Sequence, residues 1–186
     1  MISLREVVAS LYGAWRLVRL DRSAIGYFDA TVQGLWRSFF AAVLALPLDF
    51  SIMMLARSEP LPDDVLHYGL AYLIFYALSW LVWPLLALYL ARALDRADAL
   101  PLYVTAHNWA QLPINVFQLA LLILAGGFFP EDMLLMARLS LIVILFYEGY
   151  IAYVALRIDR AVAAGVAGAY FSVAYLIGLI GVFVMH

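Results

Sequence analysis

The sequence contains no cysteine and no lysine, and only 13% of its 186 residues are charged. Without cysteine, the chain has no disulfide bond, no thiol nucleophile and no thiolate metal ligand. In soluble domains about a quarter of the residues are charged, so this chain has too little charge to cover a surface that faces water. The scarcity of charge indicates an integral membrane protein.

Long apolar segments take the place of the missing charge. Hydrophobic residues make up 67% of the chain, and the mean hydropathy is +0.97. A membrane-spanning helix needs about 20 predominantly apolar residues. The pattern therefore predicts an all-α fold, a polytopic membrane helix bundle whose five transmembrane helices lie near residues 36–57, 65–92, 102–126, 133–156 and 161–185. Because the connections are short, consecutive helices are expected to be antiparallel neighbours.

The arginines are distributed unevenly between the two ends of the predicted bundle. Nine of the eleven lie before the first span or in the connections that follow the second and fourth spans, and only Arg57 and Arg138 lie elsewhere. Arginine is enriched in cytoplasmic loops, so we expect a cytoplasmic N-terminus and a C-terminus outside. The first apolar run lies too far from Met1 for a cleavable signal peptide. The use of arginine alone indicates a GC-rich genome, and hence a bacterial inner membrane.

The N-terminal arm, residues 1–34, precedes the predicted transmembrane domain, residues 35–186. Residues 3–20 have helical periodicity, with the apolar side chains Leu4, Val7, Val8, Leu11, Tyr12, Trp15 and Val18 on one face. This pattern predicts an N-terminal amphipathic interfacial helix, which holds Arg5, Trp15, Arg16 and Arg19 among the lipid headgroups. The alternative is that the helix packs along the bundle and fixes its topology.

A second helical stretch is expected to lead from the arm into the first span. It covers residues 23–40. Asp29, Gln33 and Arg37 would then lie one turn apart and would bond along the helix.

Five polar side chains crowd into the third predicted span: His107, Asn108, Gln111, Asn115 and Gln118. On a helix the four amides fall within an arc of roughly 80°, with His107 at its margin. An unpaired amide in hydrocarbon costs several kcal/mol, so this polar stripe is expected to face other helices. It either joins helices, which we favour, or lines a route for a solute, a proton or a lipid headgroup.

Three ionisable residues are expected at membrane depth: Asp49, Arg138 and Glu148. Such residues usually mark functional sites. Counted at about 1.5 Å per residue, Asp49 and Arg138 have similar depths, so an ion pair between them is predicted. Glu148 falls level with Asn108 and Gln111, which predicts a contact with those amides.

The second span carries an aromatic stripe, with Tyr68, Tyr72, Tyr76 and Trp80 at four-residue spacing and Trp83 on the same side. Tyr72 and Tyr76 reach the level of Asp49 and are expected to donate phenolic hydrogen bonds. A stripe of this kind more often packs against other helices than binds a ligand.

Small residues recur in the fifth span, at Ala161, Gly165, Gly168, Ala174, Gly178 and Gly181. They permit close approach of another helix. That helix belongs either to the same chain or to a second copy.

Motifs for catalysis are missing: the sequence has no Gly-rich phosphate loop, no HExxH and no serine elbow. Asp63, Asp64 and His67 form a possible divalent-ion site, but acids are common at helix starts. We therefore expect no enzyme, no catalytic residue, no metal and no cofactor. The expected partners are the lipid bilayer and other membrane proteins or a second copy, with no nucleic acid.

The stretch "LVWPLLALYLARALDRADALPLYVTAHNWAQLP", residues 81–113, places an inner loop before a span with an internal proline. Together with the five-span layout and the cytoplasmic arm, this resembles the Yip1-like family. Eukaryotic members of that family are non-enzymatic organisers of trafficking membranes and bind small GTPases. The resemblance therefore implies a non-enzymatic organiser of membranes. The acidic N-terminal motif of those members has no good match here, and no functional residue is transferred.

Three functions remain after this reasoning. We favour a non-enzymatic membrane organiser or accessory subunit of a complex. The alternative is a small transporter or channel whose path is lined by the third-span amides and the intramembrane acids. An enzyme that acts on lipid would need a polar cavity open sideways near Glu148, and a water-accessible cavity that reaches the polar stripe would separate these functions best.

Overall fold

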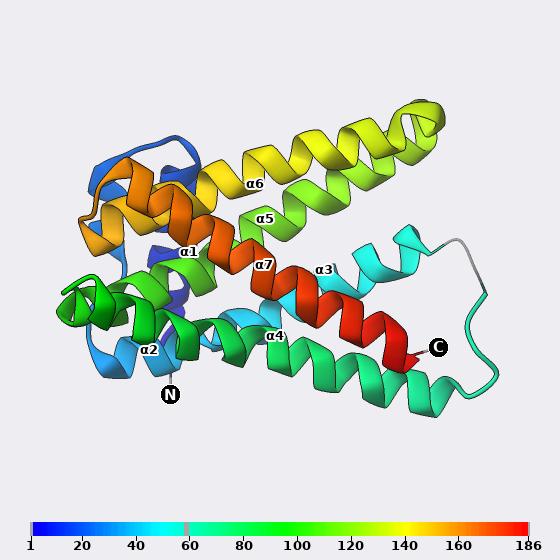
Figure 1. Ribbon diagram of the computed structural model, residues 1–186, viewed down its shortest axis with the longest axis horizontal. Coiled ribbons are helices and arrows are strands. Elements are labelled where there is room, and N and C mark those ends of the chain that lie inside the picture. Colours follow the sequence, from blue (N-terminus) through cyan, green and yellow to red (C-terminus); the bar gives the residue numbers. More distant parts are fainter. Residues whose placement is uncertain (1, 58–59, 186) are drawn as a thin grey trace.

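Helices make up the computed structural model of the chain, which describes residues 2–57 and 60–185 (Figure 1). The α-helices are α1 (Leu4–Val18), α2 (Val32–Ser38), α3 (Phe40–Ala56), α4 (Val65–Ala93), α5 (Leu100–Phe128), α6 (Met133–Leu156) and α7 (Arg160–Met185). Short 3₁₀ helices lie between them, namely η1 (Arg22–Tyr27), η2 (Ala97–Ala99) and η3 (Pro130–Asp132).

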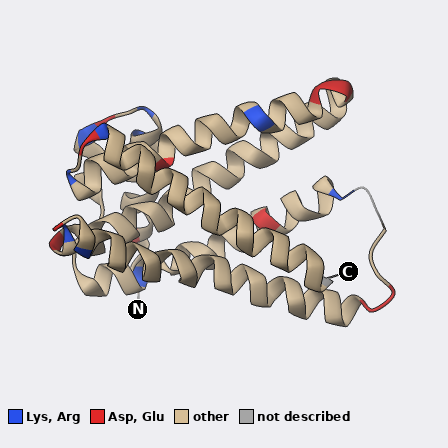
Figure 2. Cartoon of the chain, viewed as in Figure 1, with Lys and Arg blue, Asp and Glu red and all other residues tan. Residues whose placement is uncertain are grey.

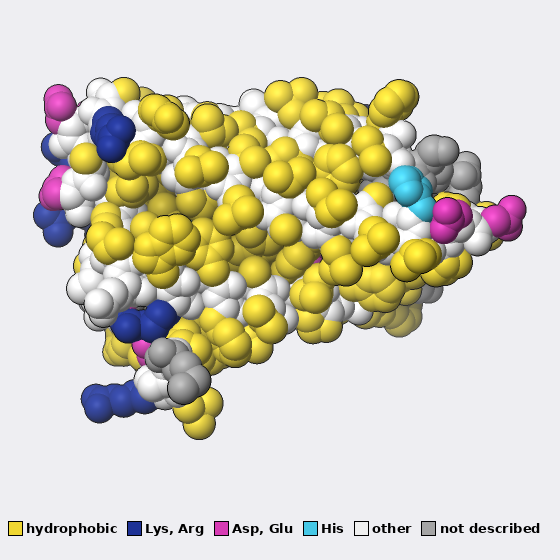
Figure 3. Space-filling model, turned by 90° about the horizontal axis from the view of Figure 1, so that it is seen from below, with side chains coloured by type: hydrophobic (Ala, Val, Ile, Leu, Met, Phe, Trp, Pro, Cys, Tyr) yellow, Lys and Arg dark blue, Asp and Glu magenta, His cyan; other side chains and the backbone are white. Residues whose placement is uncertain are grey.

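Five segments are long and apolar enough to cross a membrane, as predicted: Val32–Ala56, Val65–Ala93, Ala97–Phe128, Pro130–Leu156 and Arg160–Val184. Charged residues gather at the two ends of the bundle, and few lie between (Figure 2). Apolar side chains cover much of the face seen in Figure 3 between the two ends, and many large apolar side chains of the five segments are exposed. Such a surface is suited to acyl chains rather than water, so the chain is a multi-pass membrane protein.

The helix ends follow local sequence signals. Asp64 caps α4, because its carboxylate accepts a hydrogen bond of 2.9 Å from the backbone N–H of His67. Pro101 lies in the first turn of α5, where its missing N–H costs nothing. Arg157 ends α6 in the left-handed conformation, with φ of 55°.

The helix α1 packs on the bundle, as in the alternative derived from its sequence. Its buried face is made of the small residues Ser10, Gly13 and Ala14 together with Leu17. Tyr147 of α6 donates a hydrogen bond of 3.0 Å to the Ala14 carbonyl. The apolar side chains on the other side stay exposed, and Trp15 is 51% exposed. The helix therefore has its small face on protein and its large apolar face outward.

The expected continuous helix from residue 23 to residue 40 is wrong. The 3₁₀ helix η1 ends at Tyr27, Phe28 is extended, and Thr31 caps α2 by accepting a hydrogen bond from the backbone N–H of Gly34. Asp29 consequently lies ahead of α2 instead of within a helix. The short-range polar bonds of Asp29 and Thr31 compete with helix formation and turn the chain here.

Arg37 holds this turn against α1. Its guanidinium forms ion pairs with Asp29 and with Glu6 of α1. Hydrogen bonds from Thr31, together with the charge of Arg37, hold the pKa of Asp29 below its ordinary value. A lowered carboxyl pKa means that the stabilising contribution is present above the ordinary carboxyl range and is lost as the pH falls through the folded-state value.

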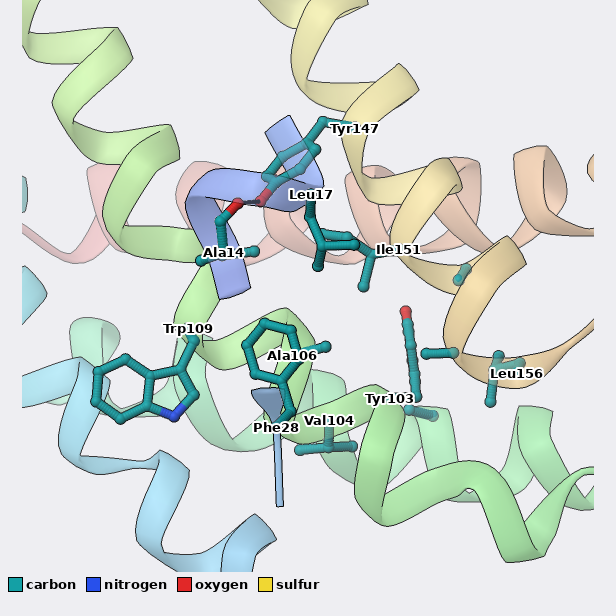
Figure 4. Packing of buried hydrophobic residues seen from close by; sticks show 14 of the residues in the cluster. Ala14, Leu17, Phe28, Tyr103, Val104, Ala106, Trp109, Tyr147, Ile151 and Leu156 are labelled. Carbon is teal, nitrogen blue, oxygen red and sulfur yellow. Dashed lines mark hydrogen bonds between the residues drawn. The ribbon is translucent and has the colours of Figure 1, made fainter. Parts of the chain in front are cut away.

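The helix α5 forms the centre of the bundle. Its residues 103–110 are all buried, because α1, α2, α3, α4 and α6 contact it. Figure 4 shows Tyr103, Val104, Ala106 and Trp109 of α5 packed among side chains of α1 and α6. Beyond Asn115, the far halves of α5 and α6 run together, away from α3, α4 and α7 (Figure 1). The bundle is thus tightly packed in one half and spread apart in the other.

The small residues of α7 point mostly outward. An added Cβ on Gly165, Gly168 or Gly178 would meet no atom within 4 Å, whereas one on Gly181 would lie 3.3 Å from the Phe75 ring. The packed face of α7 is instead formed by Ala163, Val166 and Ala167.

We expect Gly34→Ala to lower the thermal stability of the protein. The new Cβ would lie 2.5 Å from the Asp29 Cβ and 2.6 Å from the Asp29 carbonyl oxygen, so backbone must shift. Overpacking of this kind costs about 1–3 kcal/mol. The measurement is the melting temperature in detergent, followed by tryptophan fluorescence.

Gly165→Ala is the matched control, because nothing lies within 4 Å of its added Cβ. Alanine is the better helix former, so this variant should melt at the same temperature as the parent or above it. Equal losses in the two variants would contradict the proposed close approach at Gly34.

Candidate functional site: a polar cavity beside a buried Glu–His pair

A buried acid lies in the middle of the bundle, where α5 meets α6. Glu148 is only 1% exposed, and both of its carboxylate oxygens have partners on α5. His107 Nδ1 lies 2.8 Å from Oε2, and Gln111 Nε2 donates to Oε1, also at 2.8 Å. The predicted contact of Glu148 with an amide is confirmed for Gln111, and His107 is an additional partner.

The donors on α5 satisfy the buried acid. A buried carboxylate is tolerated only where donors satisfy it. The imidazole Nδ1 is such a donor when it carries a proton, and the Nε2 of the same ring lies 3.4 Å from Gln111 Nε2. The hydrogen bonds of Glu148 to His107 and Gln111 therefore join α6 to α5.

Aromatic rings surround the imidazole of His107. The Tyr170 ring of α7 meets it edge-on, with 4.9 Å between the centroids, and the rings of Trp83 and Tyr103 each lie at 6.2 Å. The Tyr170 hydroxyl also donates to Gln111 Oε1, at 3.4 Å. Four helices thus meet around His107, and the rings fix its orientation in an environment of low polarity.

A cavity of about 370 Å³ opens beside this cluster, on the side where the bundle spreads. All five residues of the polar stripe line it, as does Asp49. The volume lies in the range of small-molecule sites, about 300–1,000 Å³. Toward the arginine-rich end the core is closed by Tyr103, Val104 and Ala106, none more than 2% exposed. The cavity therefore reaches His107 and is closed beyond it.

The amides of the stripe have different roles. Asn108, 1% exposed, donates a hydrogen bond of 2.8 Å to the Ser38 hydroxyl, which in turn donates to the Leu35 carbonyl. Asn115 is only 7% exposed and faces the cavity, yet the described part of the chain gives it no hydrogen bond. One amide joins helices, and the other presents its donor and acceptor to the cavity.

Of the partners predicted for Asp49, Tyr72 is confirmed and Arg138 is not. Its carboxylate accepts a hydrogen bond of 2.9 Å from the Tyr72 hydroxyl. Arg138 is exposed on α6 and forms no ion pair with any described acid. The expected Asp49–Arg138 pair is therefore wrong, because Asp49 of α3 bonds to α4, whereas Arg138 is exposed on α6.

The aromatic stripe of α4 joins this helix to α3. Tyr68 contacts the Met53 sulfur, Tyr72 bonds Asp49, and Tyr76 donates to the Ala42 carbonyl at 2.6 Å. Of the predicted pair of donors, Tyr72 reaches Asp49 and Tyr76 does not. Trp80 continues the row and also lines the cavity.

The four residues expected at the lipid surface lie on or next to α1. Arg16 forms an ion pair with Asp21 and bonds the Tyr27 hydroxyl, and Arg19 lies over the Trp15 ring at 5.2 Å. Arg5 is exposed. Hydrogen bonds from Ser23 and the bond to Arg16 hold the pKa of Asp21 below its ordinary value.

The possible divalent-ion site at the start of α4 has a structural explanation. Asp64 is the helix cap, and the His67 ring lies 3.3 Å from the Val184 carbonyl of α7. Within residues 2–57 and 60–185, no group of three His, Asp or Glu side chains lies close enough to hold a metal ion.

Sequence reasoning missed Tyr170, Ser38 and the role of Trp83. Tyr170 interrupts a run of small residues, "AGVAGAYFS". A phenol in such a run was the feature of the sequence that could have marked Tyr170 as part of a polar site. Ser38 gave no signal of its own, because a serine at the start of a span is common.

Neither the protein-family models, nor the curated proteins, nor the solved structures contain a match to this chain.

We expect Asn108→Leu to lower the melting temperature in detergent. It removes the hydrogen bond to Ser38, and bonds between membrane helices contribute about 0.6 kcal/mol on average and up to about 2 kcal/mol. Asn115→Leu is the matched control, because it removes no hydrogen bond within the described chain and places an apolar side chain in the cavity. An equal loss of stability in both variants would show that Asn115 also joins helices.

Proposed function

We propose that the chain is a small, non-enzymatic transporter of a bacterial inner membrane, which moves a small polar solute together with a proton. The observation that carries this proposal is the cavity of about 370 Å³, which brings the polar stripe, Asp49 and the His107–Glu148 cluster to one place. Polar contacts that only joined helices would leave no polar space between them.

In the proposed mechanism the solute binds to the unpaired groups of the cavity. Asn115 offers one donor and one acceptor, and Asp49 keeps one carboxylate oxygen free of hydrogen bonds to the described residues. Glu148 lies behind His107 and Gln111, which form the wall. A proton that enters through the cavity reaches the carboxylate by way of the imidazole, and its arrival weakens the bonds that hold α5 to α6.

The conformation described here, with one half of the bundle closed, is then one end state of the transport cycle. The arginine-rich end faces the cytoplasm by the positive-inside rule, with the N-terminus inside and the C-terminus outside. In this orientation the cavity communicates with the outer half of the bilayer, and the buried layer around Tyr103 and Ala106 closes the inner half. Separation of α5 from α6 after protonation would open that layer.

We propose no enzymatic activity for this site. The acids at the cavity lie beside amides, phenols and an imidazole that are engaged with one another, and not beside an activated nucleophile. A carboxylate and an imidazole in this setting are suited to proton transfer between bound groups.

The transporter proposal is tested with purified protein in liposomes that enclose a pH-sensitive dye. With an imposed potential and a panel of small polar solutes, the parent protein should show solute-dependent proton entry. Glu148→Gln keeps the shape and one acceptor but removes the titratable group, so the rate should fall at least tenfold while the melting temperature changes little. Glu131→Gln, which alters an exposed acid of η3, is the control and should leave the rate unchanged.

Two results would contradict the transporter. One is the absence of flux for the parent over the whole panel. The other is an unchanged rate in Glu148→Gln.

A membrane organiser or accessory subunit is the second candidate, and the exposed apolar face of α1 favours it. Leu4, Val8 and Trp15 are 79%, 58% and 51% exposed on a helix at the cytoplasmic end of the proposed orientation. Together with the outward small residues of α7, this face would suit a protein partner or a second copy. The five-span layout that resembles the Yip1-like family is consistent with this role. Copurification of a stoichiometric partner, combined with the absence of flux, would establish it.

A further inference from the structure

A second cavity lies at the arginine-rich end of the bundle and is separate from the polar cavity. Its volume is about 520 Å³. It is bounded by the start of η1, the chain just after α4, and the turn between α6 and α7. Arg22, Arg96 and Arg157 line it together with Tyr153, and Asp159 is the one acid in its wall. We refer to it below as the arginine pocket.

The charge of the arginine pocket is not neutralised by the protein. Three guanidinium groups and one carboxylate give a formal charge of 3 − 1 = +2. None of the three arginines forms an ion pair with an acid of the described chain, in contrast to Arg16 and Arg37, which do. An anion is the missing partner.

Arg22 and Arg96 are held in place by contacts that leave donors free. Arg22 lies over the Tyr153 ring, 5.0 Å from its centroid, and Arg160 lies over the same ring at 5.9 Å. Arg96 Nε reaches the Arg157 carbonyl at 3.5 Å, which joins the end of α4 to the end of α6. The remaining N–H groups point to no carboxylate, and guanidinium groups bind phosphate oxygens in pairs.

The position of the arginine pocket identifies the source of the anion. Its walls come from the ends of three membrane-spanning helices, at Leu94 after α4, Val154 in α6 and Val162 in α7. That is the depth of lipid headgroups, and basic pockets between spans on the cytoplasmic side are suited to anionic headgroups. The apolar walls at Leu94, Ile158 and Val162 offer contact to the first carbons of the lipid.

We propose that the arginine pocket binds the phosphate group of an anionic phospholipid. Arg22, Arg96 and Arg157 are the ligands of the phosphate, and Tyr153 positions Arg22. This site is independent of the transport proposal, because it shares no lining residue with the polar cavity.

The test measures lipid binding to the full-length protein in detergent by native mass spectrometry. Phosphatidylglycerol is titrated against the parent and against the triple variant R22Q/R96Q/R157Q. The control triple variant R5Q/R19Q/R92Q removes the same charge from the same end of the protein, but outside the pocket. We expect the Kd for phosphatidylglycerol to rise at least tenfold in the pocket variant and less than threefold in the control.

Two further comparisons identify the ligand and guard against misfolding. Phosphatidylcholine should bind at least tenfold more weakly than phosphatidylglycerol, and inorganic phosphate at equal concentration should not displace the lipid. The charge-conserving variant R22K/R96K/R157K should bind more tightly than the glutamine variant, which separates loss of charge from loss of structure. If the glutamine triple does not fold, Arg157→Gln alone should still weaken binding.

Three outcomes would overturn the proposal. Equal losses in the pocket and control variants would indicate a diffuse charge effect. An unchanged Kd in the pocket variant would exclude the pocket. Displacement of the lipid by inorganic phosphate would show a phosphate site that does not belong to a lipid.

Discussion

The whole bundle depends on the burial of one carboxylate. Glu148 is 1% exposed in a segment that crosses the membrane, where a charge without partners costs several kcal/mol. Its two oxygens require donors from a neighbouring helix, and His107 and Gln111 supply them one turn apart on α5. The register of α5 against α6 follows from this requirement, and the position of His107 in turn fixes where Tyr170 and Trp83 pack.

The spread of the bundle has a physical origin in the same helix. Over residues 103–110, α5 is surrounded by other helices and all its side chains are buried. Beyond Asn115 its large side chains Val116, Phe117 and Ile123 face outward, so nothing draws the far half toward α3 or α4. The polar stripe crosses this boundary. Asn108 therefore has a protein partner, and Asn115 has the cavity.

The five spans were predictable because hydropathy and length decide them, and the depth of Glu148 relative to Gln111 followed from counting residues along helices. Counting gives depth only and does not say which side of the bundle a residue occupies. It therefore matched Asp49 with Arg138 as well as with Tyr72, and only Tyr72 is a partner. The helix that was expected to include Asp29 does not form, for another reason. Its side chain bonds the backbone N–H of Thr31 and replaces a helical bond, a local competition that apolar periodicity does not reveal.

The polar cavity and the arginine pocket share no lining residue, yet α6 and α7 contribute to the walls of both. Glu148 and Tyr153 lie on the same helix, and between them Gly149 brings α6 against α7, where an added Cβ would lie 3.6 Å from the Ala163 carbonyl and from the Ala167 Cβ. These are ordinary van der Waals distances, so α6 and α7 are in contact at this point. Glu148 and Tyr170 therefore lie one on each helix of the pair that the turn at Arg157 joins. The hydrogen bonds of Glu148 to His107 and Gln111 connect this pair of helices to α5, the centre of the bundle.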